Sequence, residues 1–293
     1  MFDALDTRIG YELDSAEDGE QAIPLLTADE EKEMNVSDVP ETLPILTLRN
    51  TTLFPGVVLP ITVGRDASLQ LVKDAAAVDR EIGVIAQRVP EIENPSPDDL
   101  FEIGTVASIL KLIKMPDGSQ SIVIQGRRRF RIQEFIQEDP YFIAQVSPHD
   151  DTQEGDEIEI AARVRSIKEL AVQIINLSPN LPSEAAYAIQ NIDSPSFLVH
   201  FIASNLPIEL ADKQKLLEAL SPLKRAELVL DHLNQELQVL QLSEEIRSRV
   251  RTDVDQQQRE FLLRQQMKAI QDELGEVDGH PAELEELRTK ITE

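Results

Sequence analysis

The stretch from Leu223 to Leu274 contains neither glycine nor proline, and it constrains the fold of this chain more than any other feature. Glycine and proline are the residues that most often end a helix, so their absence predicts one continuous helix. At about 1.5 Å per residue such a helix is roughly 75 Å long. This length exceeds the radius of a small domain several times. We therefore expect part of the helix to extend beyond any core that this chain builds.

The apolar residues of this predicted helix form three seams rather than one stripe. Because the seams point in different directions around the helix, one partner helix cannot cover all of them. We expect the first seam to pack on neighbouring helices and the third to be exposed. The seams are Leu230, Leu233, Leu237 and Leu240; then Ile246, Val250 and Val254; then Leu263, Met267, Ile270 and Leu274.

Residues 43–148 show the pattern of a β domain. Short runs rich in Ile and Val are bounded by Pro, Gly and Asp, and several alternate between apolar and polar residues. The Asp-Gly pair in "MPDGSQ" (115–120) predicts a hairpin turn. One helix over 65–79 interrupts the strands, with Asp66 and Ser68 as candidate N-caps. Many short strands and a single helix predict a compact, curved β domain that is at least partly closed into a barrel.

Two motifs in this β region allow more than one interpretation. The sequence "LFPG" (53–56) predicts a tight turn, and Leu53 and Phe54 beside it are candidates for an exposed apolar contact surface. In "GRRRFRI" (126–132), arginines alternate with Phe130 and Ile132. This alternation favours the outer face of a half-buried strand over a patch that binds nucleic acid.

After Gly155 the apolar period becomes helical. The run "EIEIAARVRSIKELAVQIINL" predicts a helix over 157–177, which the prolines that follow would end. Ser194 and Ser221 each precede a proline at the start of a helical pattern, so we predict that both are N-caps. These helices are joined by short loops, which predicts a bundle over residues 155–240.

Acidic residues dominate the composition and are concentrated at the start of the chain. The formal net charge is −26, and residues 1–41 carry 13 acidic side chains against Arg8 and Lys32. A segment of this kind buries too little apolar surface to fold, so we expect residues 1–41 to be a disordered acidic tail. The acidity also argues against nucleic acid as a partner. No cysteine and no long apolar run occur, so we expect a cytoplasmic protein without a membrane span.

The sequence contains no pattern that assembles an active site. No glycine is followed by lysine, as a phosphate-binding loop requires, and no two glycines are separated by a single residue, as in a dinucleotide-binding fingerprint. The four histidines lack metal-ligand spacing. We therefore expect no catalytic, cofactor-binding or metal-binding residue in this chain.

Four segments resemble the N-terminal region of the Lon family of ATP-dependent proteases. The most specific is "REFLLRQQMKAIQDELGE" (259–276), and the resemblance covers about residues 42–293. The other three are "LPILTLRNTTLFPGVVLPITVGRDASLQLV" (43–72), "VIQGRRRFRI" (123–132) and "FIASNLPIELADKQKLLEAL" (201–220).

The resemblance implies an α+β fold. A PUA-like, substrate-recognising β domain (42–148) would follow the acidic tail (1–41). A helical bundle (155–240) and a long helix (241–293) would lead toward an ATPase module. The chain would be truncated within "ELEELRTKITE" (283–293), before the parts that bind ATP and Mg and carry a Ser-Lys dyad.

For the parent protein, the resemblance implies a cytoplasmic hexamer that degrades misfolded and regulatory proteins. The N-terminal region would then contact unfolded or damaged protein and support assembly. The candidate contact residues are Leu53, Phe54, Leu262, Met267 and Ile270. For the last three, packing on a neighbouring helix explains the apolar pattern equally well. A different class of function also remains open, namely a non-enzymatic scaffold or adaptor that self-associates through its long helix.

Overall fold

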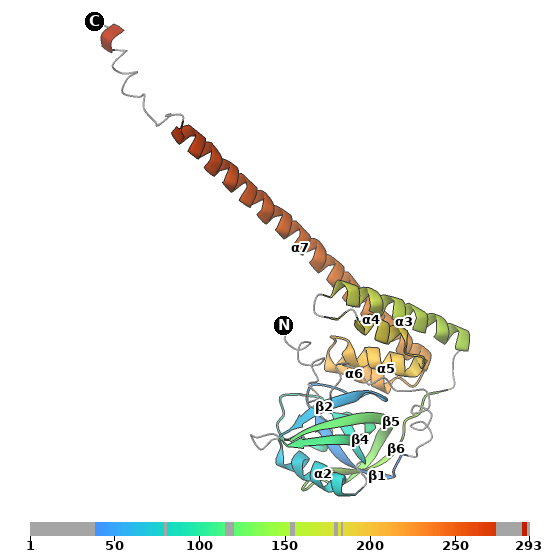
Figure 1. The fold of residues 1–293 in the computed structure, drawn as a ribbon. Coiled ribbons are helices and arrows are strands. Elements are labelled where there is room, and N and C mark those ends of the chain that lie inside the picture. Colours follow the sequence, from blue (N-terminus) through green and yellow to red (C-terminus); the bar gives the residue numbers. More distant parts are fainter. Residues whose placement is uncertain are drawn as a thin grey trace, which may run out of the picture. The chain divides into compact units, whose positions relative to one another are not determined.

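The structure is a computed structural model that describes residues 39–78, 81–114, 120–152, 156–178, 181–182, 184–273 and 289–291. The chain forms two units, Met1–Gln238 and Val239–Glu293. The first unit contains a mixed sheet and several helices, so the predicted α+β class is confirmed (Figure 1). The predicted acidic tail falls almost entirely on residues outside the described ranges.

The β part of the first unit is a six-stranded sheet in the order β2-β5-β4-β3-β1-β6. An additional pairing between β5 and β6 closes β1, β3, β4, β5 and β6 into a ring, with β2 on the side of β5. All pairings are antiparallel except that of β1 with β3. The elements are β1 (Thr42–Leu48), β2 (Val58–Val63), α2 (Asp66–Ala77), β3 (Glu81–Ala86), η1 (Pro97–Asp99), β4 (Ile103–Lys114), β5 (Gln120–Gln137) and β6 (Ile143–Pro148).

Strand β5 runs over 18 residues and pairs with β2, β4 and β6 along its length. One local prediction for the β part needs correction. The N-cap of α2 is Arg65, which makes no capping hydrogen bond through its side chain. The predicted caps are wrong because Asp66 is already the first helical residue. At that position its carboxylate interacts favourably with the positive end of the helix dipole. The predicted hairpin turn falls on residues 115–119, outside the described ranges.

The predicted turn at "LFPG" is present and is fixed by two glycines. Val57 N donates to the Phe54 carbonyl at 3.2 Å, and Gly56 has a φ of 77°, which an L side chain rarely adopts. On β5, a Cβ at Gly126 would lie 2.2 Å from the Phe54 carbonyl oxygen. Only glycine therefore lets the turn approach β5 so closely. Two backbone hydrogen bonds of 2.9 Å, between Gly126 and residues 56 and 57, hold the turn there.

In the described residues up to 273, the sheet is followed by the helices α3 (Glu157–Leu177), α4 (Glu184–Gln190), α5 (Pro195–Asn205), α6 (Leu210–Glu218) and α7 (Pro222–Glu273). The predicted caps are confirmed, since Ser194 accepts from Phe197 N at 3.1 Å and Ser221 accepts from Lys224 N at 3.4 Å. The single long helix is also confirmed. The short helix α4 was not predicted, because it is only two turns long and lies between proline-rich segments.

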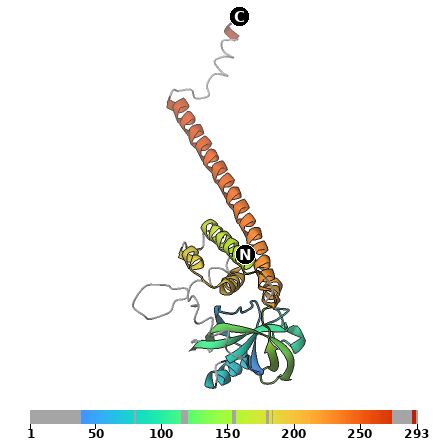
Figure 2. The ribbon, with the colours of Figure 1, turned by 90° about the vertical axis from the view of Figure 1, so that its right-hand side faces the viewer.

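The helices of the first unit share a hydrophobic core with part of the sheet. Phe54, Val57 and Ile103 from the β part pack in the same cluster as Phe197, Leu198 and other residues of α3 to α7. Two further clusters fill the sheet region, one of them beneath α2. Figure 2 shows α3 to α6 and the start of α7 grouped on one side of the strands, with α2 on the other. The shared cluster holds the helices against the sheet, because burial of apolar surface is favourable on both sides of the contact.

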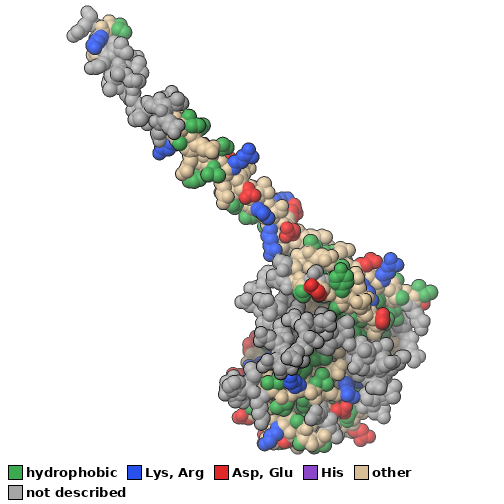
Figure 3. Space-filling model, viewed as in Figure 1, with side chains coloured by type: hydrophobic (Ala, Val, Ile, Leu, Met, Phe, Trp, Pro, Cys, Tyr) green, Lys and Arg blue, Asp and Glu red, His purple; other side chains and the backbone are tan. Residues whose placement is uncertain are grey.

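Helix α7 passes from a buried to an exposed environment along its length. Ala226, Val229, Leu233 and Leu237 are buried in the first unit. Beyond Gln238, hydrophobic side chains reach the surface among charged ones (Figure 3). Leu274 lies outside the described residues. Among the helices in the described ranges, none combines the length and the apolar character that a bilayer-spanning segment requires.

Candidate functional site

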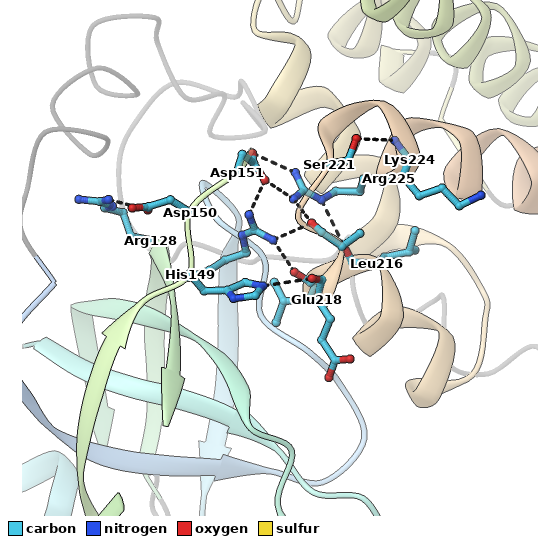
Figure 4. A network of polar contacts seen from close by, with 12 residues as sticks. Arg128, His149, Asp150, Asp151, Leu216, Glu218, Ser221, Lys224 and Arg225 are labelled. Atoms are coloured by element: carbon cyan, nitrogen blue, oxygen red, sulfur yellow. Dashed lines mark hydrogen bonds and ion pairs between the residues drawn. The ribbon is translucent and has the colours of Figure 1, made fainter. Parts of the chain in front are cut away.

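The most connected polar site of the first unit joins the sheet to the helices (Figure 4). Its centre is Asp151, just after β6, and two arginines bind it. Arg129 comes from β5, and Arg225 comes from the first turn of α7. We call these three residues, together with the carbonyl groups that end α6, the clasp. Both guanidinium groups are almost fully buried, whereas 32% of the Asp151 side chain is exposed.

The clasp satisfies the backbone at the end of α6. The last carbonyl groups of any α-helix lack partners within the helix. Here Arg129 donates to the carbonyls of Leu217 and Ala219 at 2.7 and 2.9 Å. Arg225 donates to those of Leu216 and Ala219 at 3.2 and 2.5 Å. The two positive charges also lie where the helix dipole is negative, which is the favourable arrangement.

Each arginine also contacts the same carboxylate. Arg129 Nη2 donates to Asp151 Oδ1, and Arg225 donates to Oδ1 at 2.5 Å and to Oδ2 at 3.3 Å. His149 Nε2 lies 3.1 Å from the Glu218 carbonyl, and Asp150 pairs with Arg128 at 2.6 Å on the exposed side. The carboxylate thus offsets part of the positive charge buried between sheet and helices.

Burial sets the electrostatics of the site. Desolvation, followed by the nearby Arg225 charge, lowers the pKa of Arg129 to about 10, while Asp151 opposes the shift. Desolvation also lowers the pKa of His149 from its usual 6.5, although the Glu218 carbonyl opposes that change. The pKa of His200, buried in α5, lies well below 6.5 because of desolvation and the charges of Arg225 and Arg129. At neutral pH Arg129 is therefore charged, and both histidines are neutral.

This chemistry suits a structural joint rather than a reaction centre. The donors of the two guanidinium groups point at protein acceptors, and no nucleophile is activated by a base within the clasp. Within the described ranges, no group of three His, Asp or Glu residues is arranged to hold a metal ion. The clasp therefore positions α6 and the start of α7 on β5.

The arginines of "GRRRFRI" were predicted to lie on the outer face of a strand, and this holds for only some of them. Arg127 and Arg131 pair with Glu81 and Glu102 at 3.6 and 3.2 Å near the surface. Arg129 lies between them but is buried. The prediction fails for Arg129 because helices, rather than solvent, cover the sheet at that point. Neither the spacing nor the residue types indicated that Arg225 would be its neighbour.

Leu53 and Phe54 do not form the exposed contact surface suggested by the sequence. Their exposed fractions are 2% and 0%, and the Phe54 ring centre lies 6.0 Å from that of His200. The turn at Pro55 and Gly56 directs Phe54 toward the helices, where it joins their core. The sequence pattern of an apolar pair beside a turn is the same whether the pair faces solvent or packs against a second layer of structure.

The other three contact candidates lie in the second unit and are exposed. Leu262, Met267 and Ile270 have exposed fractions of 59%, 62% and 54%. Three further apolar residues of α7, which none of the three predicted seams includes, are also exposed: Val239, Leu242 and Phe261. Their signal was their spacing from the second seam, because Val239 and Leu242 precede Ile246 at intervals of three and four residues and Phe261 follows Val254 after seven.

Comparison with known proteins gives the same picture as the sequence motifs. The model of the ATP-dependent protease La (LON) substrate-binding domain matches residues 42–235. Lon protease of Flavobacterium johnsoniae is 49% identical over 271 residues, which cover 92% of this chain and 33% of that protein. Lon protease of Cytophaga hutchinsonii is 47% identical over 269 residues, again 92% of this chain and 33% of that protein.

A solved structure shows the same fold at lower identity. The N-terminal domain of Lon protease from the Mycobacterium avium complex is 22% identical, with a TM-score of 0.54 over 66% of this chain and 98% of that one. The chain spans about a third of the length of the curated relatives it matches. The family model covers most of the described sheet and helices. The chain therefore belongs to the ATP-dependent protease La (LON) substrate-binding domain family.

Proposed function

We propose that this chain recognises substrates and supports assembly for an ATP-dependent protease that degrades misfolded and regulatory proteins. Membership of the substrate-binding domain family over residues 42–235 supports this function. In the proposal, residues 42–148 form the recognition domain, 155–240 the bundle, and 241–293 the helix that leads to an ATPase module. The complete protease would be a cytoplasmic hexamer, and ATP and Mg would bind outside this chain.

The proposal that this chain contacts substrates is supported by the exposure of apolar side chains near the end of α7. Leu263, Met267 and Ile270, here called the distal patch, are each more than half exposed. Unfolded proteins differ from folded ones in presenting apolar segments, so an apolar surface is the simplest device that selects them. Methionine adapts its shape to different partners, which suits a surface that binds many sequences.

Binding of a denatured, fluorescently labelled model protein to the purified chain tests this proposal. The double variant Met267→Glu/Ile270→Glu should bind about tenfold more weakly, because each buried apolar side chain contributes about 1–3 kcal/mol and 1.4 kcal/mol equals a factor of ten. The matched control, Gln258→Glu/Gln265→Glu, adds the same charge to the opposite side of the same helix and should bind as the parent chain does.

Equal binding by both double variants would contradict a role for the distal patch. The same measurement distinguishes substrate recognition from the alternative function of a scaffold. A scaffold that only self-associates through its long helix would not capture denatured protein at all, with or without these substitutions.

A further inference from the structure

Strand β2 forms an open edge of the sheet in the first unit. It lies at the end of the strand order and pairs with β5 alone, whereas each strand of the ring has two neighbouring strands. Within the described residues, no further backbone hydrogen bond forms along the side of β2 that faces away from β5. An open edge presents unpaired N–H and C=O groups, to which another extended segment can bind.

The register with β5 identifies the backbone groups that face this open side. Gly126 N donates to the Val57 carbonyl at 2.9 Å, which continues the register of β2 and makes these two residues a hydrogen-bonded pair. Bonded and non-bonded pairs alternate along an antiparallel ladder, so every second residue of β2 directs its backbone groups away from β5. These residues are Val58, Pro60 and Thr62. They offer two N–H donors and three carbonyl acceptors, because proline has no N–H.

The open edge of β2 is poorly protected against pairing. Proteins usually protect such edges with charged side chains, bulges or proline. Residues 109–114 of β4, which pair with β5 but not with β3, follow this rule, since they contain a bulge and the exposed Lys111. In contrast, β2 contains no charged residue and pairs with β5 without a bulge. Pro60 is its single protecting residue, and it removes one N–H group only.

Apolar side chains flank the open edge on both faces of the sheet. Leu59 and Ile61 are half-buried and pack against the core cluster beneath α2. Val58 and Pro60 lie on the opposite face and are also half-buried, with Pro60 opposite Val123 of β5. A strand added at this edge would place alternate side chains on the two faces. Its apolar side chains would then extend an existing apolar surface.

An extended polypeptide matches this arrangement of groups. Successive outward residues of a strand are about 6.8 Å apart, which is also the repeat of the N–H and C=O groups along another extended chain. A helix bonds its own backbone groups and cannot pair with the edge. The strands of a folded protein are already paired, whereas unfolding exposes them. Because the hydrogen bonds involve only the backbone, binding of this kind tolerates many sequences.

We propose that the open edge of β2 binds strand-forming segments of unfolded proteins as an added antiparallel strand. Val58 and Thr62 would each exchange two hydrogen bonds with the segment, and Pro60 would accept one. Leu59 and Ile61 would contact its apolar side chains, because polar residues of β2 and β5 lie on the other face. The inference rests on the proposed function and deepens it, since it names the class of segment recognised and the backbone groups that bind it.

Methylation of a peptide backbone tests these hydrogen bonds. The probe is the fluorescent peptide Lys-Thr-Val-Thr-Val-Thr-Val-Thr-Lys, and its binding to the full chain is measured by anisotropy. With the valines against Leu59 and Ile61, the threonine N–H groups point at β2 and the valine N–H groups point away. N-methylation of the threonines should weaken binding about tenfold or more, whereas N-methylation of the valines should leave it unchanged. Equal binding of the methylated peptides, the reverse order, or no binding of the parent peptide would overturn the proposal.

Substitutions at the edge test the proposal from the side of the protein. Pro60→Val adds an outward N–H and should strengthen binding of the unmethylated peptide about three- to tenfold, as one further hydrogen bond would. This gain cannot result from misfolding. Thr62→Pro removes an outward N–H and should weaken binding by a similar factor, whereas the matched control Thr62→Ala should bind as the parent chain does. Parent affinity in the P60V variant would overturn the proposal.

Two further outcomes are distinguishable. A dimer of the parent chain that T62P converts to a monomer would show that a second copy occupies the edge, and would overturn the proposal. Denatured model protein that binds the parent chain, T62P and T62A equally would also overturn it, while the proposed function would stand. If denatured protein binds none of these chains, the proposed function fails together with the inference.

Discussion

Asp151 is the residue on which the joint between sheet and helices depends most. It is the carboxylate that both Arg129 and Arg225 contact. Buried guanidinium groups lose their hydration, and a nearby carboxylate is the strongest available compensation. Removing one member of a buried group of charges lowers the stability of the fold by more than the whole group contributes to it, because the remaining charges stay buried without compensation.

The variant Asp151→Asn should therefore destabilise the chain. We expect a loss of about 2–3 kcal/mol, below the usual 3–5 kcal/mol for a buried pair because 32% of the Asp151 side chain is exposed. The neighbouring Asp150 pairs with Arg128 at the surface, so Asp150→Asn should cost less than about 1 kcal/mol. Urea unfolding of the two variants measures both values. Equal losses would show that the carboxylate of Asp151 has no special role.

His200 should make stability depend on pH. Burial keeps its pKa well below 6.5 in the folded chain, while the unfolded chain has the ordinary value of about 6.5. Below about pH 6.5 the unfolded state thus binds a proton that the folded state does not. Stability is full above this pH and falls as the pH drops, by up to about 1.4 kcal/mol per unit.

The variant His200→Leu isolates this contribution. Unfolding free energies between pH 7 and 5 should fall less steeply in the variant than in the parent chain, because the leucine does not titrate. Comparison of the two slopes removes the effect of other groups, including His149, whose pKa is also lowered. Identical slopes would mean that His200 binds its proton equally well in both states.

At the scale of elements, α7 is one helix with two sources of stability. Its first turns pack Ala226, Val229 and Leu233 into the core of the first unit. Its later turns expose most of their apolar side chains, and their charged residues contribute only i,i+4 pairs such as Arg249–Glu245. A helix in water gains most of its stability from packing, so the later turns depend on a partner.

Hydrogen exchange should reveal this difference along α7. In a demonstrated monomer, amides of residues 255–273 should exchange far faster than those around Leu233 and Leu237. Mass spectrometry of overlapping peptides resolves the two regions. Equal protection along the helix of a demonstrated monomer would rule out this account.

At the scale of the whole molecule, the described structure begins shortly before β1. Val39 packs against a core cluster of the sheet, and the Glu41 carbonyl accepts a hydrogen bond from Val146 N at 2.9 Å. The predicted tail of residues 1–41 thus includes a few residues that contribute to the folded unit. The acidic composition of residues 1–38 still predicts that they add nothing to the core.

Two deletions distinguish these parts. Removal of residues 1–38 should leave the melting temperature within about 2 °C of the parent chain. Removal of residues 1–41 should lower it further, by about 2–8 °C, because a packed apolar side chain and a backbone hydrogen bond are lost. Calorimetry of both chains provides the comparison. A large decrease from the shorter deletion would show that residues 1–38 pack on the fold.

The sequence by itself determined the features that depend on neighbours along the chain. The run without glycine or proline predicted α7, the Pro55-Gly56 pair predicted the turn, and Ser194 and Ser221 before prolines predicted two caps. Each of these follows from backbone geometry and hydrogen bonds within a few residues. The motifs that indicated the family are likewise contiguous.

Only the tertiary structure decided which side of each element meets another. It buried Phe54 and Arg129, which the sequence pattern placed at the surface, because Phe54 packs against α5 and Arg129 lies beneath the end of α6. It also left Ile246 and Met267 exposed, although their spacing resembles that of the packed Leu233 and Leu237. Periodicity shows that a face is apolar, but burial requires a partner from elsewhere in the chain or from another chain. That partner is set by the packing of distant segments, which no local pattern encodes.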